Sequence, residues 1–200
     1  MADKNYRAST GVDEFYYALL DPTEVAIITG EPERVEFLQN ISIEMPQEAV
    51  RAYGDNRTAE IAVASGNISV TGAFHTIPNE DKTKLFGLDS ATGLTAYGST
   101  DSPPYVAAIF SKTYEDGSRE WVGLTKGMFM RPTITGATKA DGVEFSSEEM
   151  TAEFMDRDVT GFDDAKSVIF GRDTPGTNTQ RDALFTAVFG ANHPDFVVGP

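Results

Sequence analysis

The chain has 200 residues, of which 40% are hydrophobic, so it is long enough for one domain with a buried core and is not disordered as a whole. Its formal net charge of −15, from 31 acidic and 16 basic side chains, argues against tight nucleic-acid binding, which needs Lys and Arg to neutralise phosphates. Cysteine is absent, which excludes disulfides, thiol nucleophiles and Cys-ligated metals.

The first part of the sequence predicts short strands joined by turns. Asp21-Pro22 and Gly66-Asn67 are turn signals, and apolar residues alternate with polar ones on both sides of the second. Pro46, Gly54 and Asp55-Asn56 interrupt the pattern, which indicates a long loop. The predicted elements are a flexible polar arm at 1–12, strands at Phe15–Leu20, Val25–Thr29, Val35–Ile43, Ala59–Ala64 and Ile68–Phe74, and a loop at Met45–Arg57.

A short helix is predicted at Glu80–Phe86. Asn79 can cap its first turn, and Gly87 can supply the left-handed residue that closes it. A helix of about two turns is too short to be stable alone. We therefore expect Leu85 and Phe86 to dock it on the body of the protein.

The clearest hairpin joins Tyr105–Tyr114 to Arg119–Met130. Asp116-Gly117 stands at its tip and is a favoured turn pair, because both residues can adopt positive φ. Trp121 is expected to be buried if the sheet packs on both faces.

The rest of the chain predicts further strands and a second helix. Acidic residues indicate one solvated face of a strand pair within Ile134–Phe154, and Val168–Phe170 is a candidate final strand. An apolar stripe predicts a helix at Gln180–Phe189, with Thr179 and Asp182 approximating a capping box. Many short strands with one or two short flanking helices indicate a mainly β fold, an antiparallel sandwich or barrel.

Nothing in the sequence indicates a catalytic, cofactor or metal site. The two histidines, His75 and His193, fit no metal-ligand spacing, and neither a nucleophile elbow nor a phosphate-binding glycine loop occurs. The acidic cluster Asp156–Asp164 does not match the EF-hand pattern and is interpreted as a solvated loop. We therefore predict no enzyme activity and no cofactor.

No membrane partner is predicted either. No apolar run approaches the ~20 residues of a membrane span. The polar start Met1-Ala2-Asp3-Lys4-Asn5 lacks the apolar core of a signal peptide, so a cytosolic product is expected.

Five short fragments occur in a fixed order over residues 16–107: Tyr16-Tyr17-Ala18, Gly30-Glu31-Pro32-Glu33, Tyr53-Gly54-Asp55-Asn56, Leu85-Phe86-Gly87 and Pro103-Pro104-Tyr105-Val106-Ala107. In order and spacing they resemble the major tail (tail tube) proteins of long-tailed, non-contractile bacteriophages. The resemblance implies a β-sandwich or barrel that forms hexameric rings, stacked as the virion tail tube after synthesis in the host cytoplasm. It also implies partners: other copies, tape-measure, tail-tip and tail-terminator proteins, and double-stranded DNA that passes without tight binding.

The resemblance also suggests a division of the chain and candidate site residues. The division is a flexible arm at 1–12, a tail tube β domain at 13–172, and a C-terminal linker and helix at 173–200. An acidic lumen would repel phosphate, although solubility alone also explains the charge. The inter-ring candidates are Gln47, Glu48, Arg51, Tyr53, Asp55 and Asn56, and the lumen candidates are Glu36, Gln39 and Glu60.

Three alternatives remain open. A tube protein of a contractile tail or secretion machine would share the fold but need a sheath. An acidic β-sandwich binding module, such as a carbohydrate-binding domain, would be a monomer with exposed aromatic residues on one face. An enzyme that works with carboxylates alone would bring two acids together in a deep cleft.

Overall fold

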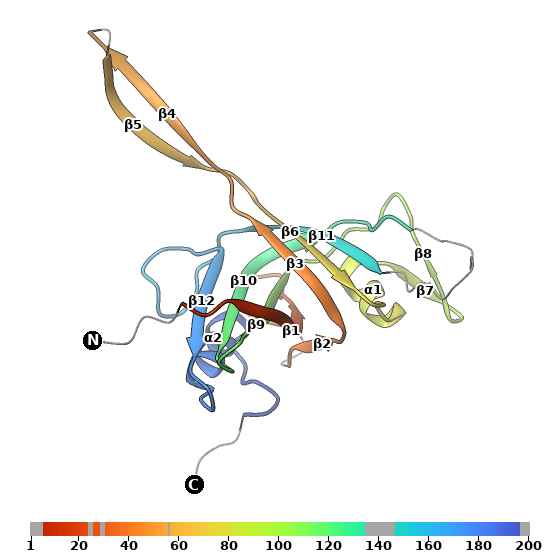
Figure 1. The fold of residues 1–200 in the computed structure, drawn as a ribbon. Coiled ribbons are helices and arrows are strands. Elements are labelled where there is room, and N and C mark those ends of the chain that lie inside the picture. The colour runs from red at the N-terminus through yellow and green to blue at the C-terminus, as the bar shows by residue number, and fades with distance from the viewer. Residues whose placement is uncertain (1–5, 24–25, 29–30, 56, 135–146, 197–200) are drawn as a thin grey trace, which may run out of the picture.

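The computed structural model describes residues 6–23, 26–28, 31–55, 57–134 and 147–196 (Figure 1). The described chain is mainly antiparallel β with two short helices, which confirms the predicted fold class. In chain order the elements are β1 (Ser9–Leu19), β2 (Glu33–Val35), β3 (Leu38–Glu44), β4 (Gln47–Gly54), β5 (Arg57–Ser65), β6 (Ile68–Phe74), α1 (Asn79–Phe86), β7 (Asp89–Ala91), β8 (Leu94–Ala96), β9 (Val106–Tyr114), β10 (Arg119–Phe129), β11 (Glu148–Met155), β12 (Val168–Asp173) and α2 (Thr179–Phe189).

One eight-stranded sheet forms the body, in the order β2-β1-β9-β10-β11-β6-β3, with β12 as a further partner of β10. Strand β10 joins two halves of this sheet. Its residues 119–124 pair with β12, and its residues 126–129 pair with β11 on the same side. The described sheet runs from edge strand β2 to edge strand β3, so it is open and not a closed barrel.

The two halves of the sheet pack face to face around the larger core. Phe15 of β1 meets Phe74 of β6 edge to face, with ring centroids 5.1 Å apart. Leu85 and Phe86 of α1 are fully buried in the same core, as predicted, and Gly87 closes the helix in the left-handed conformation. The packing is therefore that of a sandwich with a helix at its rim.

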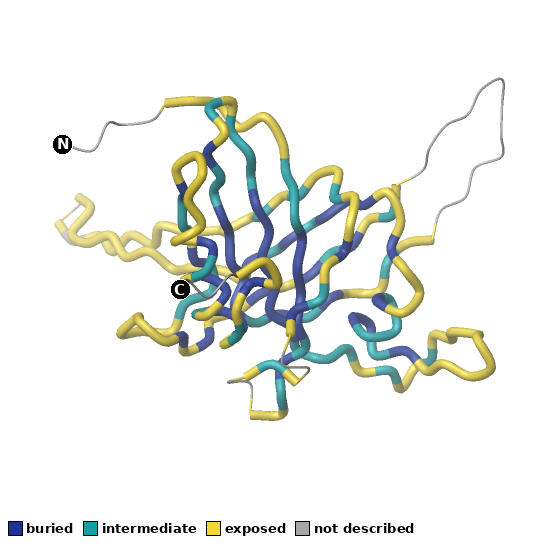
Figure 2. Tube along the Cα trace, turned by 90° about the horizontal axis from the view of Figure 1, so that it is seen from below, coloured by how far each residue is buried: buried dark blue, intermediate teal, exposed yellow. Residues whose placement is uncertain are grey.

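A second core covers the other face of β1, β9 and β10 with α2. Alternate residues of β9 point to opposite faces, so Phe110 belongs to the first core and Ile109 to the second. Trp121 is buried against Phe185 of α2. A Cβ on Gly123 would lie only 2.8 Å from Cγ2 of Val188, so glycine lets α2 approach the sheet closely. Figure 2 shows these central strands buried.

Three predicted segments in the first half of the chain are corrected. The strand predicted at Val35–Ile43 is broken at Glu36-Phe37, where Phe37 has a φ of +63° and is exposed. The loop predicted at Met45–Arg57 contains strand β4. It was missed because its side chains are exposed and no burial pattern marks them. Ser9–Val12, placed in the predicted arm, already belong to β1.

Other predictions fall partly on residues that are not described. These residues are 1–5 of the arm, Val25 and Thr29 of the strand predicted at Val25–Thr29, and 135–146 of the strand pair predicted within Ile134–Phe154. Near Val25–Thr29 the structure contains an isolated bridge between Leu20 and Ile27.

Both predicted helix caps are also corrected. Pro78, and not Asn79, precedes α1, and no side chain caps it. The capping box of Thr179 and Asp182 does not form at α2. Instead the buried carboxylate of Asp173, the last residue of β12, accepts hydrogen bonds from the backbone N–H groups of Gln180 at 2.8 Å and Arg181 at 2.9 Å. A negative charge at a helix N-terminus is stabilising, so Asp173 holds α2 on the sheet.

Asp173→Ala is expected to lower the free energy of unfolding by about 1–2 kcal/mol, because two α2 amides lose their acceptor. Urea unfolding followed by the fluorescence of Trp121, the single tryptophan, measures this. Thr179→Ala is the matched control and should change stability by less than about 0.5 kcal/mol. An equal cost for both substitutions would mean that Asp173 is not the cap.

Candidate assembly surfaces

Strands β4 and β5 form a hairpin that projects from the body (Figure 1). They pair from Gln47 opposite Ser65 to Gly54 opposite Arg57, and they lie between β3 and β6 in the sequence. Each side chain that the structure describes between residues 47 and 67 is exposed, as Figure 2 shows. The hairpin is therefore not part of either core.

Apolar side chains occupy both faces of this hairpin. Ile61 and Val63 share one face and Val50 lies on the other, because residues opposite each other in an antiparallel pair share a face. Their exposed fractions run from 54% for Val50 to 63% for Ile61, and that of Tyr53 near the tip is 71%. An isolated two-stranded hairpin is at best marginally stable in water. The described part of the chain offers it no partner, so the hairpin is suited to bind another molecule.

The predicted inter-ring residues lie on this hairpin. Gln47, Glu48, Arg51 and Tyr53 belong to β4, and Asp55 follows in the turn with a φ of +50°. Asn56 lies outside the described residues. The structure thus brings the five described candidates together on a strand and turn rather than on a loop, and their inter-ring role stays a prediction.

The predicted lumen residues do not form one surface. Glu36 lies between β2 and β3, and Gln39 lies on β3 near its start. Glu60 lies on β5, opposite Ala52 in the hairpin. The hairpin leaves β3 at the other end, after Glu44, so Glu60 is separated from the other two. All three are exposed, and their place in a lumen stays a prediction.

A continuous polar face covers β3, β6 and β11 on the side away from the core. The cross-strand rows follow from the register: Ser42, Thr71 and Thr151 form one, and Glu44, Ser69 and Glu153 form the next. In the sequence, this face could be recognised because Ser69, Thr71 and Glu153 alternate with apolar residues, which the structure shows to be buried. This polar sheet face, which carries three carboxylates and neither Lys nor Arg, consists of Asn40, Ser42, Glu44, Ser69, Thr71, Glu149, Thr151 and Glu153.

A partly buried charge cluster fastens the segment after α2 to β1. Glu14 has a φ of +53° at an irregularity of β1, and its carboxylate forms an ion pair with Arg119 of β10. The other carboxylate oxygen lies 3.6 Å from Nε2 of His193. Burial raises the pKa of Glu14, but the nearby imidazole of His193 and guanidinium of Arg119 outweigh it, and the pKa falls to about 2.

His193 is a structural residue and not a catalytic one. Its side chain is fully buried among the rings of Tyr16, Trp121 and Phe185. Nδ1 accepts a hydrogen bond from the backbone N–H of Asp195 at 2.9 Å, so a neutral ring carries its proton on Nε2, facing Glu14. A substrate cannot reach this ring. The other histidine, His75, is exposed after β6.

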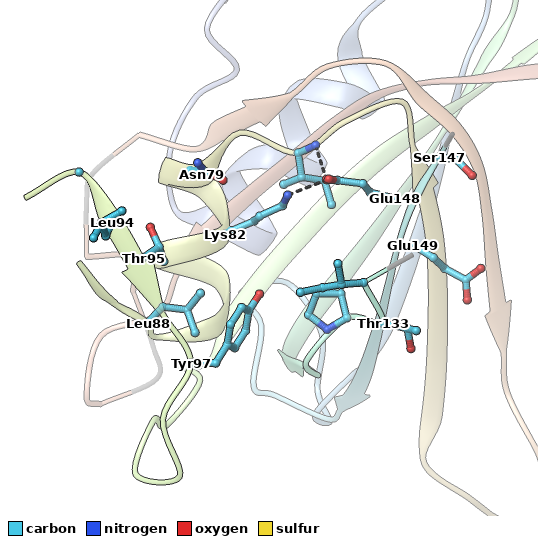
Figure 3. Close-up of a pocket in the computed structure, with 14 residues that line it drawn as sticks. Asn79, Lys82, Leu88, Leu94, Thr95, Tyr97, Thr133, Ser147, Glu148 and Glu149 are labelled. Atoms are coloured by element: carbon cyan, nitrogen blue, oxygen red, sulfur yellow. Dashed lines mark hydrogen bonds and ion pairs between the residues drawn. The ribbon is translucent and has the colours of Figure 1, made fainter. Parts of the chain in front are cut away.

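A pocket of about 390 Å³ opens between α1, the β7–β8 hairpin and the start of β11 (Figure 3). Glu148 lines this pocket, and its carboxylate accepts hydrogen bonds from Nζ of Lys82 and from the backbone N–H of Ile77, both at 2.8 Å. Burial and the charge of Glu148 raise the pKa of Tyr97, against the lowering effect of Arg131, so its hydroxyl stays protonated. Glu149 points away from Glu148 in Figure 3, so these two acids do not converge.

Neither a metal-binding cluster nor a membrane-spanning helix occurs in the described part of the chain. Those residues contain no group of three or more His, Cys, Asp or Glu arranged to hold a metal ion, and the carboxylates of Asp156, Asp158, Asp163 and Asp164 are exposed. No helix within the same residues is long and apolar enough to cross a membrane.

The sequence matches the family model described as phage tail tube protein over residues 39–194. The matched range includes the β4–β5 hairpin, the polar sheet face and both helices. The match agrees with the resemblance of the five fragments at the level of tail tube proteins. No curated protein matches the sequence.

Matches among solved structures include chains from two assemblies. A chain of the anti-feeding prophage cap (AFP tube terminating cap) is 13% identical, with 86% of this chain and 96% of that chain covered and a TM-score of 0.49. A chain of the PVC sheath–tube complex of an extracellular contractile injection system is 13% identical, with coverages of 84% and 93% and a TM-score of 0.44. At these values the likeness carries no argument about function.

Glu14→Gln is expected to lower the free energy of unfolding by about 1–3 kcal/mol at pH 7, because Arg119 and His193 lose a buried anionic partner. The pKa of Glu14 is lowered from 4.5 to about 2, so its contribution is present above pH 4.5 and is lost as pH falls towards 2. Urea unfolding of both proteins across that range measures the difference. If the difference in unfolding free energy between the two proteins does not narrow in acid, this account is contradicted. The control is Glu115→Gln, which removes an exposed ion pair with Arg7.

Proposed function

Because this chain belongs to the phage tail tube protein family, we propose that its copies form hexameric rings that stack into the tail tube of a long, non-contractile phage tail. The observation that carries the proposal is the β4–β5 hairpin, which exposes apolar side chains on both faces. A stacked tube supplies the missing partner from another copy. The family is a structural one, so the proposal includes no catalysed reaction.

The position of the hairpin suits head-to-tail growth. The hairpin continues β3 and β6 beyond one end of the sheet. The surface that binds it on the next copy is therefore a different part of the molecule from the hairpin itself. Such heterologous contacts generate rings where the rotation closes and filaments where it does not. Edge strands β2 and β3 of the described sheet have unpaired backbone groups on one side, and side-by-side pairing within a ring would satisfy them.

The polar sheet face is our candidate for the wall of the conduit. Glu44, Glu149 and Glu153 repel phosphate, and the hydroxyls of its Ser and Thr residues offer no fixed positive charge to hold it. A surface of this kind lets a DNA duplex slide during ejection. Glu36, Gln39 and Glu60 remain additional candidates, proposed from the sequence alone.

The proposed partners follow from the family and not from a particular contact. They are other copies of the chain, the tape-measure, tail-tip and tail-terminator proteins, and passing double-stranded DNA. The protein is proposed to be made in the host cytoplasm and to reside in the virion tail. The absence of a sheath is proposed from the five sequence fragments, which resemble proteins of non-contractile tails.

Ile61→Asp combined with Val63→Asp is expected to abolish tubes while the protein remains folded. Both side chains are exposed and belong to neither core, so the unfolding free energy should change by less than about 1 kcal/mol. Negative-stain electron microscopy and urea unfolding measure the two effects. Phe170→Asp on β12, 52% exposed, is the control and should still form tubes. Tubes of the double variant at wild-type yield would overturn the role of the hairpin.

Glu44→Lys combined with Glu153→Lys tests the conduit wall. These residues lie in one cross-strand row on either side of Ser69, so two cations in that row would hold phosphate and lower infectivity per assembled particle by roughly tenfold or more. Particle counts by electron microscopy and plaque titres measure this. Asp158→Lys with Asp163→Lys makes the same charge change in an exposed loop and should leave infectivity unchanged. Normal infectivity of the first variant would exclude this face from the wall.

A further inference from the structure

We propose that the pocket beside Tyr97 receives the tip of the β4–β5 hairpin from a second copy of this chain. This Tyr97 pocket is the cavity lined by Ile77, Lys82, Leu88, Leu94, Tyr97 and Glu149, among others. The inference rests on the proposed function and deepens it, since it names the site on the next copy that binds the hairpin.

The hairpin and the pocket lie at opposite ends of the same strands. Ser69, at the start of β6, pairs with Glu44, after which the hairpin begins. Phe74, at the end of β6, pairs with Glu148 at the pocket. The seven residues of β6 span about 23 Å and the eight of β4 about 26 Å, at roughly 3.3 Å per residue. A copy displaced along the strands therefore brings its hairpin tip to the pocket of the next copy.

Both surfaces expose apolar groups that water solvates poorly. The mouth of the pocket carries Leu94, exposed by 74%, and Ile134, exposed by 83%, above the buried Ile77 and Leu88. Figure 3 shows the hydroxyl of Tyr97 pointing into the space beside α1 and Lys82. The hairpin presents Tyr53 near its tip. An aromatic side chain that fills a pocket is the usual anchor of a protein interface.

The pocket volume also fits this occupant. Its volume of about 390 Å³ is within the range of roughly 300–1,000 Å³ that takes a small organic group, enough for one tyrosine side chain. Lys82 and Glu148 already compensate each other's charge within the lining, so an uncharged aromatic group meets no unpaired charge from these two residues.

Single cysteines test the contact directly, because the natural chain has none. Tyr53→Cys protein is mixed with Leu94→Cys protein, concentrated and oxidised, and disulfide-linked dimers are separated on a non-reducing gel. The matched control mixes Tyr53→Cys with Phe170→Cys, which places the second thiol on exposed β12. Docking raises the effective concentration of the two thiols, so the first mixture should yield about tenfold more mixed dimer than the control. A double variant, Tyr53→Cys with Leu94→Cys, should form a ladder of linked chains.

The outcomes separate this inference from the proposed function. Preferential linking of Tyr53→Cys to Leu94→Cys supports the inference. If this pair forms no more mixed dimer than the control pair, the inference is overturned. The proposed function is unaffected by that result if the wild-type protein forms tubes under the same conditions. Failure of wild-type protein to form rings or tubes even with its phage partners counts against the proposed function itself. Leu94→Asp, at an exposed position, should abolish tubes without loss of folding, and its tubes at wild-type yield would also overturn the inference.

Discussion

Burial of strands β1, β9 and β10 on both faces is the constraint on which the rest of the fold depends. Successive residues such as Ile109 and Phe110 enter different cores, so each face must be covered by another layer. The other half of the sheet covers one face, and α2 covers the other. Gly123 permits the close approach of that helix, and Asp173 fixes its start. The body thereby buries its main apolar surface within one chain.

The β4–β5 hairpin differs from this body in a way that suits assembly. Its backbone pairs within the hairpin, while side chains such as Tyr53 and Ile61 are exposed. In the proposed tube, the hairpin would enter assembly already formed as a strand pair on a folded subunit. The net charge of −15 opposes contact between free subunits, so the proposed growth requires specific docking.

Charged groups play two separate roles in this molecule. The carboxylate of Glu14 is held between Arg119 and His193 and stabilises the fold, because each partner compensates for burial. Glu44 and Glu153 instead lie on an exposed face of β3, β6 and β11 that carries neither Lys nor Arg on these three strands, and they contribute to its negative charge. The same residue type thus serves stability or surface potential according to its neighbours.

Periodicity, turn residues and short motifs are local, so they sufficed to predict the fold class, the β9–β10 hairpin, the docking of Leu85 and Phe86 and the likeness to tail tube proteins. The remaining features depend on how distant segments pack together. The tertiary structure identified β4 as a strand whose exposed residues follow no burial pattern, and it assigned the cap of α2 to Asp173 on a preceding strand. It also gathered Glu44 and Glu153 on one face and separated Glu60 from Glu36, because side chains distant in sequence become neighbours only through strand register and layer packing.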